Sequence, residues 1–300
     1  MELRGKTIAV TGATGFVGRH IAETLLERGA HVIGVVRNPD RVPALLERGV
    51  QMRRADLADP DALREAMTGT DALVSNAALL SLRRFDWNDY LQTNVRGTEN
   101  ALGAAAAAGV QRVIQISSVA SYRGHTQPLT DEDQPQLDGT ARPGPLRVYA
   151  LSKALSEQRA WQLAAAHGLS LTALRPCGIY GPFDQTIMPV LRRATRSPFI
   201  PSMARLGFVY VRDVAEAVAL ALEKPISVGR AYNITGGDET LWSFMRALNQ
   251  AQGRRWLRIP LPVPVRRLFD SSRARRELGW SCRPFAEALR ETVQRGDDHP

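Results

Sequence analysis

The strongest constraint on the fold lies in the first 29 residues, where an apolar run, a glycine-rich turn and a helical pattern follow one another directly. TIAVT, residues 7–11, is a short β-rich run, and Gly12, Gly15 and Gly18 lie between it and HIAETLLERG. A tight strand-to-helix turn needs backbone angles that side chains obstruct, and the third glycine lets the helix pack closely on the sheet. This order predicts the first βα unit of a parallel sheet.

The same alternation continues as far as residue 176. Further short apolar runs lie at 31–37, 72–78, 112–118 and 171–176, and helical patterns lie at 60–67, 86–108 and 148–167. Nearly continuous apolar strands separated by helices are typical of a parallel sheet that is covered on both faces. We therefore predict an α/β fold with a Rossmann-type doubly wound parallel sheet.

After Pro176 the pattern changes to short, proline-interrupted segments. Strand-like runs at 208–211 and 231–235 flank a helical pattern at 212–224, and a PLPVP linker at 260–264 precedes two final helices. We predict a large domain of residues 1–178 with returning segments around 207–235. Residues 179–206 and 236–300 then form a smaller, partly interleaved C-terminal substrate domain.

Composition excludes several classes of protein. The formal charge of +9 is spread along the chain without a helix-turn-helix, finger or RNP-like motif, so we expect no nucleic-acid partner. No apolar run approaches the roughly 20 residues that cross a bilayer, and nothing at the N-terminus resembles a signal peptide, so we expect no membrane partner. Cys177 and Cys282 show no metal-ligand spacing. We expect no metal and a reducing, cytoplasmic setting.

The glycine turn predicts a dinucleotide site, because bare amides at a helix N-terminus suit a pyrophosphate. NAD-preferring sites usually place a carboxylate at the end of the second strand, whereas Arg37 stands there and the first acidic residue is Asp40. Arg37 offers a cation to a 2′-phosphate. NADP(H) is therefore the favoured cofactor, NAD(H) is the alternative, and a surface arginine in a loop is the other interpretation of Arg37.

A set of ordered motifs resembles the extended branch of the short-chain dehydrogenase/reductase superfamily over essentially the whole chain. They are the glycine turn, SNAA (75–78), ISSVASY (116–122), YALSK (149–153), LRPCGIYGP (174–182), FVYVRDVAEAV (208–218) and RRELGW (275–280). The resemblance implies that Tyr149 is the catalytic acid/base and that Ser118 orients the carbonyl, with Ser117 as the less favoured alternative. It also implies that Lys153 lowers the pKa of Tyr149 and holds the nicotinamide ribose.

The residue types suit this chemistry independently of the resemblance. A phenol titrates near pH 10, and an ammonium four residues later on the same helix face favours the phenolate. A serine at the end of a strand can donate a hydrogen bond as negative charge develops on the carbonyl oxygen. Asn94 matches the family asparagine that supports Lys153 through a water; the alternative is a polar residue at a helix bend.

The remaining expected cofactor contacts follow the same motifs. Asp56 is a candidate for the adenine amino group, and Leu57 for packing the ring. The full set of cofactor residues is Gly12, Thr14, Gly15, Phe16, Val17, Gly18, Arg37, Asp56, Leu57, Asn76, Ala77, Ala78, Tyr149, Lys153, Pro176 and Gly178.

The resemblance implies an oxidoreductase that interconverts a ketone and a secondary alcohol. Apolar residues between 183 and 209, with AALLSL at 77–82, suggest an apolar substrate, as in dihydroflavonol-reductase-like and 3β-hydroxysteroid-dehydrogenase-like members; the alternative is that they pack the small domain. Val119 and Ala120 follow Ser118, so a dehydratase would lack its acid and base. A sugar-nucleotide epimerase remains the alternative, and a non-catalytic cofactor-sensing protein is less expected. A homodimer through the helices that follow the fourth strand and carry Tyr149 is the implied assembly.

Overall fold

The large domain is built on a seven-stranded sheet in which every neighbouring pair of strands is parallel. The computed structural model describes residues 1–81, 85–124, 131–145, 147–237 and 239–296. In sheet order the strands are β11 (Arg230–Ile234), β6 (Ser170–Pro176), β5 (Arg112–Ile116), β4 (Ala72–Ser75), β1 (Thr7–Thr11), β2 (His31–Val36) and β3 (Gln51–Arg54). The predicted Rossmann-type fold is confirmed.

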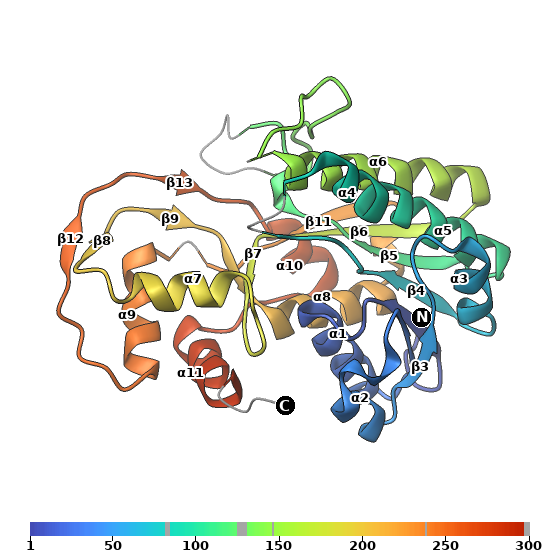
Figure 1. Ribbon diagram of the computed structural model, residues 1–300, viewed down its shortest axis with the longest axis horizontal. Coiled ribbons are helices and arrows are strands. Elements are labelled where there is room, and N and C mark those ends of the chain that lie inside the picture. Colours follow the sequence, from blue (N-terminus) through green and yellow to red (C-terminus); the bar gives the residue numbers. More distant parts are fainter. Residues whose placement is uncertain (82–84, 125–130, 146, 238, 297–300) are drawn as a thin grey trace.

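Helices cover both faces of this sheet (Figure 1). One face carries α3 (Pro60–Met67), α4 (Trp87–Tyr90), α5 (Gly97–Ala107) and α6 (Val148–His167). The other carries α1 (Phe16–Glu27), α2 (Pro43–Glu47), α8 (Val211–Glu223) and α10 (Ser272–Leu278). The central strands are buried on both sides, as Ile8, Ala9 and Val10 of β1 show with 0% exposure each. This two-sided burial explains why the strands are continuously apolar.

The strand order reverses between β1 and β4, which lie side by side although two strands separate them in the sequence. The carboxyl ends of the strands meet at one edge of the sheet, and this edge faces the small domain (Figure 1). Ligands of open α/β sheets bind outside the carboxyl ends of the strands at such a switch point. The fold therefore positions any site at this edge.

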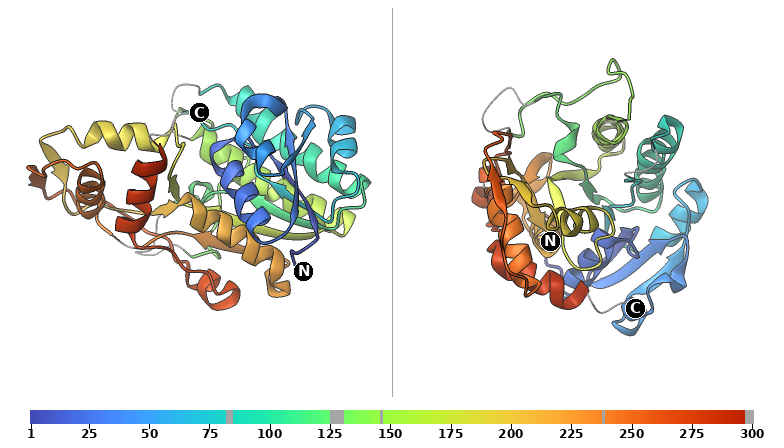
Figure 2. Two further views of the ribbon diagram at one scale, coloured as in Figure 1. Left: turned by 90° about the horizontal axis from the view of Figure 1, so that it is seen from below. Right: turned by 60° about the vertical axis from the view of Figure 1, so that its left-hand side comes forward.

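The small domain lies beyond that edge and has a separate apolar core (Figure 2). Its helices are α7 (Ile187–Ala194), α9 (Leu241–Ala251) and α11 (Phe285–Gly296). Its strands form three parallel pairs, which are β7 (Gly178–Tyr180) with β10 (Phe208–Tyr210), β8 (Phe199–Pro201) with β12 (Ile259–Leu261), and β9 (Arg205–Leu206) with β13 (Arg266–Arg267). Part of the segment expected to be a linker is thus the strand β12, which pairs with β8.

Segments from the second half of the chain return to the large domain. Strand β11 extends the main sheet beside β6, and α8 packs against α1. Helix α10 and Trp280 also belong to the core of the large domain, and the Trp280 indole Nε1 donates to the Asp213 carbonyl at 2.8 Å. Among the described residues, no helix is long and apolar enough to cross a membrane.

Candidate active site

The glycine turn between β1 and α1 has the geometry that its sequence predicts. Gly12 has a φ of +68°, a left-handed conformation that favours glycine. A Cβ on Gly18 would overlap the Gly12 carbonyl, so the start of α1 can approach the turn only without a side chain there. Gly15 is the N-cap of α1, and this end of the helix has neither a side-chain cap nor an acidic residue in its first turn. These amides fit the pyrophosphate of a dinucleotide.

The loop after β4 packs directly on this turn. The Thr11 hydroxyl accepts hydrogen bonds from the backbone amides of Asn76 at 2.9 Å and Ala77 at 3.1 Å. A Cβ on Gly12 would lie 3.1 Å from the Cα of Ala77. The glycine turn and the loop after β4 therefore lie side by side at the switch point between β1 and β4. This brings together three of the predicted cofactor contacts, Gly12, Asn76 and Ala77, and Ala78 is the next residue in the loop.

Two arginines lie at the end of β2. Arg37 is exposed at a bend directly after the strand, and no side-chain hydrogen bond or ion pair holds it among the described residues. Arg41 ends the short 3₁₀ turn Pro39–Arg41, which Asn38 caps by accepting from the Asp40 amide at 3.2 Å. The end of β2 therefore presents an exposed Arg37, and its role toward a 2′-phosphate stays a prediction.

The residues expected near adenine follow β3. Asp56 is exposed, and one of its carboxylate oxygens accepts from the Ala58 amide at 2.9 Å. The Leu57 side chain packs on Gly97, where a Cβ would lie 2.8 Å from the leucine Cδ1. Leu57 is only partly buried by this contact. At the other end of the predicted set, Pro176 ends β6 and Gly178 begins β7.

Ser118 and Tyr149 come together from different elements. Ser118 follows β5, and its hydroxyl accepts from the Ala120 amide at 3.1 Å. Tyr149 lies in the first turn of α6, and the Ser118 hydroxyl is close enough to its phenol to influence the pKa of Tyr149. Ser117 is 2% exposed, and its buried hydroxyl has no hydrogen-bond partner among the described residues. Of the two serines considered from the sequence, Ser118 is therefore the one beside the tyrosine.

Lys153 follows Tyr149 by one helical turn and is only 3% exposed. Its ammonium donates to the Ile116 carbonyl at 2.5 Å, at the end of β5. Burial lowers the pKa of Lys153 to about 8, against the opposing influence of the Glu157 carboxylate. At neutral pH the Lys153 amine is therefore still mostly protonated.

The pKa of Tyr149 differs from the sequence prediction. Burial raises the pKa of Tyr149 to about 12, and the nearby Ser118 hydroxyl only partly opposes this rise. The predicted lowering by Lys153 is not found, because the ammonium donates to the Ile116 carbonyl and desolvation of the partly buried phenol dominates the pKa of Tyr149.

Asn94 lies in a π-helical segment, Leu91–Arg96, that interrupts the single helix expected at 86–108. Its amide nitrogen donates to the Leu79 carbonyl at 3.1 Å and to the Ser152 hydroxyl at 2.9 Å, and its side-chain oxygen accepts from the Leu79 amide at 2.6 Å. Asn94 thus connects the loop after β4 to the residue that precedes Lys153. Both interpretations of Asn94 from the sequence stay predictions, and the structure shows a buried asparagine that hydrogen-bonds to Leu79 and Ser152.

Beneath Lys153, a buried ion pair joins α6 to β6, and the sequence analysis did not single it out. The Arg175 guanidinium contacts the Glu157 carboxylate at 2.6 Å, and the two side chains are 7% and 0% exposed. Burial opposes the charged form of Glu157, but the guanidinium and hydrogen bonds outweigh it and hold the pKa of Glu157 below its usual value. The available signal was the spacing, since Glu157 lies four residues after Lys153.

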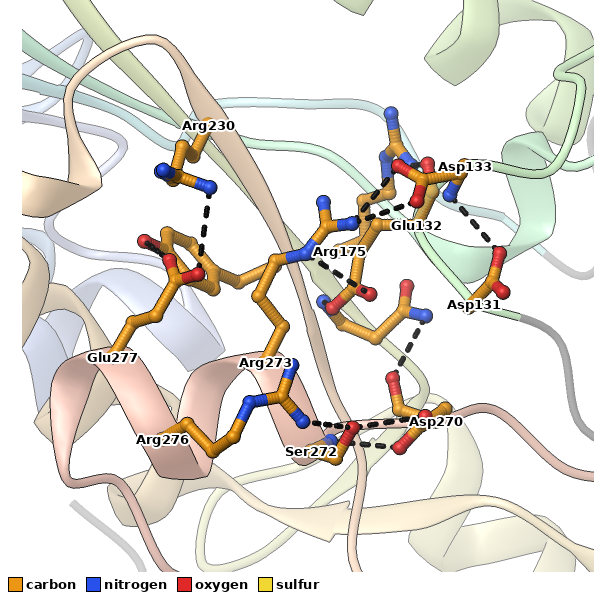
Figure 3. A network of polar contacts seen from close by, with 12 residues as sticks. Asp131, Glu132, Asp133, Arg175, Arg230, Asp270, Ser272, Arg273, Arg276 and Glu277 are labelled. Atoms are coloured by element: carbon orange, nitrogen blue, oxygen red, sulfur yellow. Dashed lines mark hydrogen bonds and ion pairs between the residues drawn. The ribbon is translucent and has the colours of Figure 1, made fainter.

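The pair continues into a polar network that reaches α10 (Figure 3). Arg175 donates to the Tyr122 hydroxyl and to the Glu132 carbonyl, both at 2.9 Å. Arg273, on α10, contacts the Asp133 carboxylate at 2.9 Å and that of Glu132 at 3.7 Å. The far end of the chain is therefore connected to the strand that carries Arg175.

A segment of the small domain is seated on the start of α1. The Phe183 ring lies 4.1 Å from the guanidinium carbon of Arg19 and stacks with His20 at 6.1 Å between ring centroids. The His20 Nε2 lies 3.3 Å from the Pro182 carbonyl oxygen. Burial lowers the pKa of His20 to about 3, so the ring is neutral at pH 7 and donates this hydrogen bond. No motif in the sequence predicted this contact.

The apolar residues that suggested an apolar substrate separate into two groups. Met188 and Ile200 are buried in the core of the small domain. Val190, Phe199 and Met203 are about half exposed. For the first group, the alternative that these residues pack the small domain is therefore correct.

A family model described as "NAD dependent epimerase/dehydratase family" matches residues 8–235, which span the glycine turn, Ser118, Tyr149, Lys153 and β11. The chain belongs to the NAD dependent epimerase/dehydratase family. This result confirms the predicted membership of the extended short-chain dehydrogenase/reductase superfamily and an NAD(P)-dependent enzyme of that type.

Relatives of this epimerase/dehydratase family member include enzymes of several names. It is 31% identical to "Sterol demethylase protein B" of Methylococcus capsulatus over 97% of this chain and 99% of the relative. It is 33% identical to "2-alkyl-3-oxoalkanoate reductase" of Stenotrophomonas maltophilia over 77% of this chain and 71% of the relative. The crystal structure of gox2253 superposes with a TM-score of 0.82 at 29% identity, over 98% of this chain and 99% of the other.

Proposed function

We propose that the protein is an NADP(H)-dependent oxidoreductase that interconverts a ketone and a secondary alcohol on a mostly apolar small molecule. The observation that carries the proposal is the meeting of Ser118, Tyr149 and Lys153 at the sheet edge that also holds the glycine turn. A bound nicotinamide would supply or accept the hydride. The chain's own residues then have to orient the carbonyl and move one proton.

Tyr149 and Ser118 divide these two tasks. With its pKa near 12, the phenol is protonated at neutral pH and can give its proton to the oxygen of a carbonyl that is being reduced. The Ser118 hydroxyl, beside the phenol, can donate a hydrogen bond to the same oxygen as charge develops there. Lys153 supplies a buried positive charge next to this pair.

Tyr149→Phe tests the acid/base role. We expect kcat to fall by about 10²- to 10⁴-fold, the usual contribution of a positioned acid or base, while binding of the reduced cofactor, followed by its fluorescence, is unchanged. Tyr90→Phe is the matched control, because the Tyr90 ring lies 6.5 Å from that of Tyr149 and its hydroxyl donates to the Ser81 carbonyl. Retained turnover in Tyr149→Phe overturns the proposed role.

Arg37 and Arg41 support NADP(H) over NAD(H), since two guanidiniums at the end of β2 suit a 2′-phosphate. Arg37→Ala is expected to weaken NADP binding about tenfold or more, the loss of one charge-assisted hydrogen bond, with little effect on NAD. Arg64→Ala, at an exposed site on α3, controls for net charge. Equal effects of Arg37→Ala on the two cofactors contradict the preference.

The names of the relatives support a carbonyl reductase, and 2-alkyl-3-oxoalkanoate reductase is one of them. A sugar-nucleotide epimerase is the alternative, because the family model covers epimerases and dehydratases. A panel of apolar ketones, secondary alcohols and nucleotide sugars, read at the NADPH and NADH absorbance and by product analysis, separates the two. Conversion of a nucleotide sugar without net cofactor turnover would replace the reductase proposal.

A further inference from the structure

A basic cavity of about 920 Å³ lies in the small domain between α7, α11 and the end of α9. The described residues that line it are Pro189, Arg192, Arg193, Arg196, Ser197, Gln252, Arg254 and Val293. Four of these eight residues are arginines and none is acidic. The lining shares no residue with the candidate active site.

The lining arginines have no carboxylate partner in the described part of the chain. Some arginines elsewhere on the surface do have one, as the ion pairs of Arg28 with Glu223 and of Arg212 with Glu27 show. The Arg192 Nε and the Gln252 Oε1 are buried, and no described residue hydrogen-bonds to either atom. Gathered like charges raise one another's energy, so the cavity favours an anion.

The C-terminal dipole of α7 accounts for only part of this arrangement. Arg192 and Arg193 lie in the last turn of α7, where a cation is favourable without any ligand. Arg254 comes from the segment after α9 and gains nothing from that dipole. The dipole of α7 therefore does not account for the presence of guanidiniums from two separate segments in one cavity.

We propose that this cavity is a binding site for a phosphate-bearing anion that carries at least two negative charges. A guanidinium presents paired N–H donors in a plane that matches two phosphate oxygens, so several arginines together recognise a phosphate group better than a simple halide. The site is separate from the glycine turn and lies outside the reaction proposed above.

Such a phosphate can arrive on a free small molecule or on a lipid headgroup. The lipid source is tested separately, because both basic segments continue along the chain into exposed apolar residues. Arg196 is followed by Phe199, which is 48% exposed, and Arg254 is followed by Leu257 and Ile259, which are 79% and 54% exposed. The backbone of Ile259 donates to the Pro198 carbonyl at 2.8 Å, which holds the two segments together.

The first experiment titrates inorganic pyrophosphate into the full-length protein by calorimetry, in a chloride buffer. The double variant Arg193→Gln/Arg196→Gln removes two exposed lining cations. The control Arg255→Gln/Arg290→Gln removes two exposed arginines of the same domain that do not line the cavity. Since both double variants lose the same net charge, and any binding at the glycine turn is common to all three proteins, the difference reports the cavity.

We expect a saturable site that the lining variant weakens at least about tenfold, the loss of one or more charge-assisted contacts, and that the control leaves within about twofold. Equal weakening in the two variants, or no saturable binding to the unmodified protein, overturns the proposal. Thermal unfolding of both variants confirms that they are folded.

Sedimentation with phosphatidylcholine vesicles, with and without phosphatidylglycerol, identifies the source. Pelleting that needs the anionic lipid and is lost only in Arg193→Gln/Arg196→Gln assigns the site to a headgroup. Pyrophosphate binding without such pelleting assigns it to a free phosphorylated molecule.

Discussion

Replacing Glu157 by glutamine should destabilise the protein strongly without changing the size of the side chain. The Glu157 carboxylate accepts from the Arg175 Nη2 at 2.6 Å and Nε at 3.1 Å, from the Gln136 amide at 2.9 Å and from the Trp161 indole at 3.2 Å. All four donors point at oxygens. Glutamine keeps one acceptor oxygen and turns an amide group toward the remaining donors.

The size of the expected destabilisation follows from the loss of the charge–charge interaction between Glu157 and Arg175. Arg175 is only 7% exposed, and its charge would remain in the interior without a carboxylate. Removing one partner of a buried ion pair costs about 3–5 kcal/mol. An exposed pair such as Arg64 with Asp61, at 54% and 94% exposure, contributes less than about 1 kcal/mol. Arg64→Gln is therefore the matched control.

The assay is urea unfolding at pH 7, with the free energy of unfolding as the readout. We expect a loss of about 3–5 kcal/mol for Glu157→Gln and less than about 1 kcal/mol for Arg64→Gln. The folded-state pKa of Glu157 lies below its unfolded value, so its stabilisation is present above about pH 4.3 and is lost as the pH falls through the folded pKa. The difference in free energy of unfolding between the wild type and Glu157→Gln should therefore decrease below about pH 4. A loss under about 1 kcal/mol at pH 7 would refute this reasoning.

Three further changes test the site. Gly18→Ala should lower the free energy of unfolding by about 1–3 kcal/mol and weaken cofactor binding, because the new Cβ would overlap the Gly12 carbonyl. Gly103→Ala, at a position on α5 with open space around it, should raise the free energy of unfolding by about 0.5–1 kcal/mol. Urea unfolding that shows the same sign of change for both variants contradicts this reasoning. The pKa of Lys153 is about 8 in the folded chain and 10.5 in the unfolded chain, so the unfolded chain binds more protons between pH 8 and pH 10.5. The free energy of unfolding of the wild type, measured relative to that of Lys153→Met, should therefore rise with pH across this range. A difference between the two proteins that does not change with pH argues against a buried ammonium. Asn94→Ala should lower the free energy of unfolding by about 1–3 kcal/mol and should also lower kcat, because it leaves the Leu79 amide without its acceptor. Urea unfolding and a kinetic assay measure the two effects, and an unchanged kcat would show that Asn94 contributes only to stability.

The sequence predicted those features that depend on neighbouring residues. The glycine turn follows from the spacing of Gly12, Gly15 and Gly18, and the main strands follow from runs that are apolar because both of their faces are buried. The meeting of Ser118 with Tyr149 could be anticipated because motif order places both at the carboxyl edge of one sheet. In each case the signal is local, or the topology of the fold brings the residues together.

What the sequence could not predict depends on burial and on distant contacts. The pKa of Tyr149 rises because the phenol is desolvated in the folded chain, and the spacing between Tyr149 and Lys153 does not predict that desolvation. The Glu157–Arg175 pair joins residues from two separate motifs. Strand β12 was hidden within a proline-rich run, where the pattern indicates a linker and only the partner strand β8 makes it a strand.

The return of the chain to the large domain after the small domain has a consequence for how the enzyme can be divided. Trp280, near the C-terminus, is 1% exposed in the core beneath the main sheet, and β11 forms the edge of that sheet beside β6. A fragment that ends at Pro176 would leave β6 as a bare edge and uncover the face that α8 and α10 protect. Because α8 and β11 lie between the segments of the small domain in the sequence, no single continuous piece of the chain contains the small domain alone.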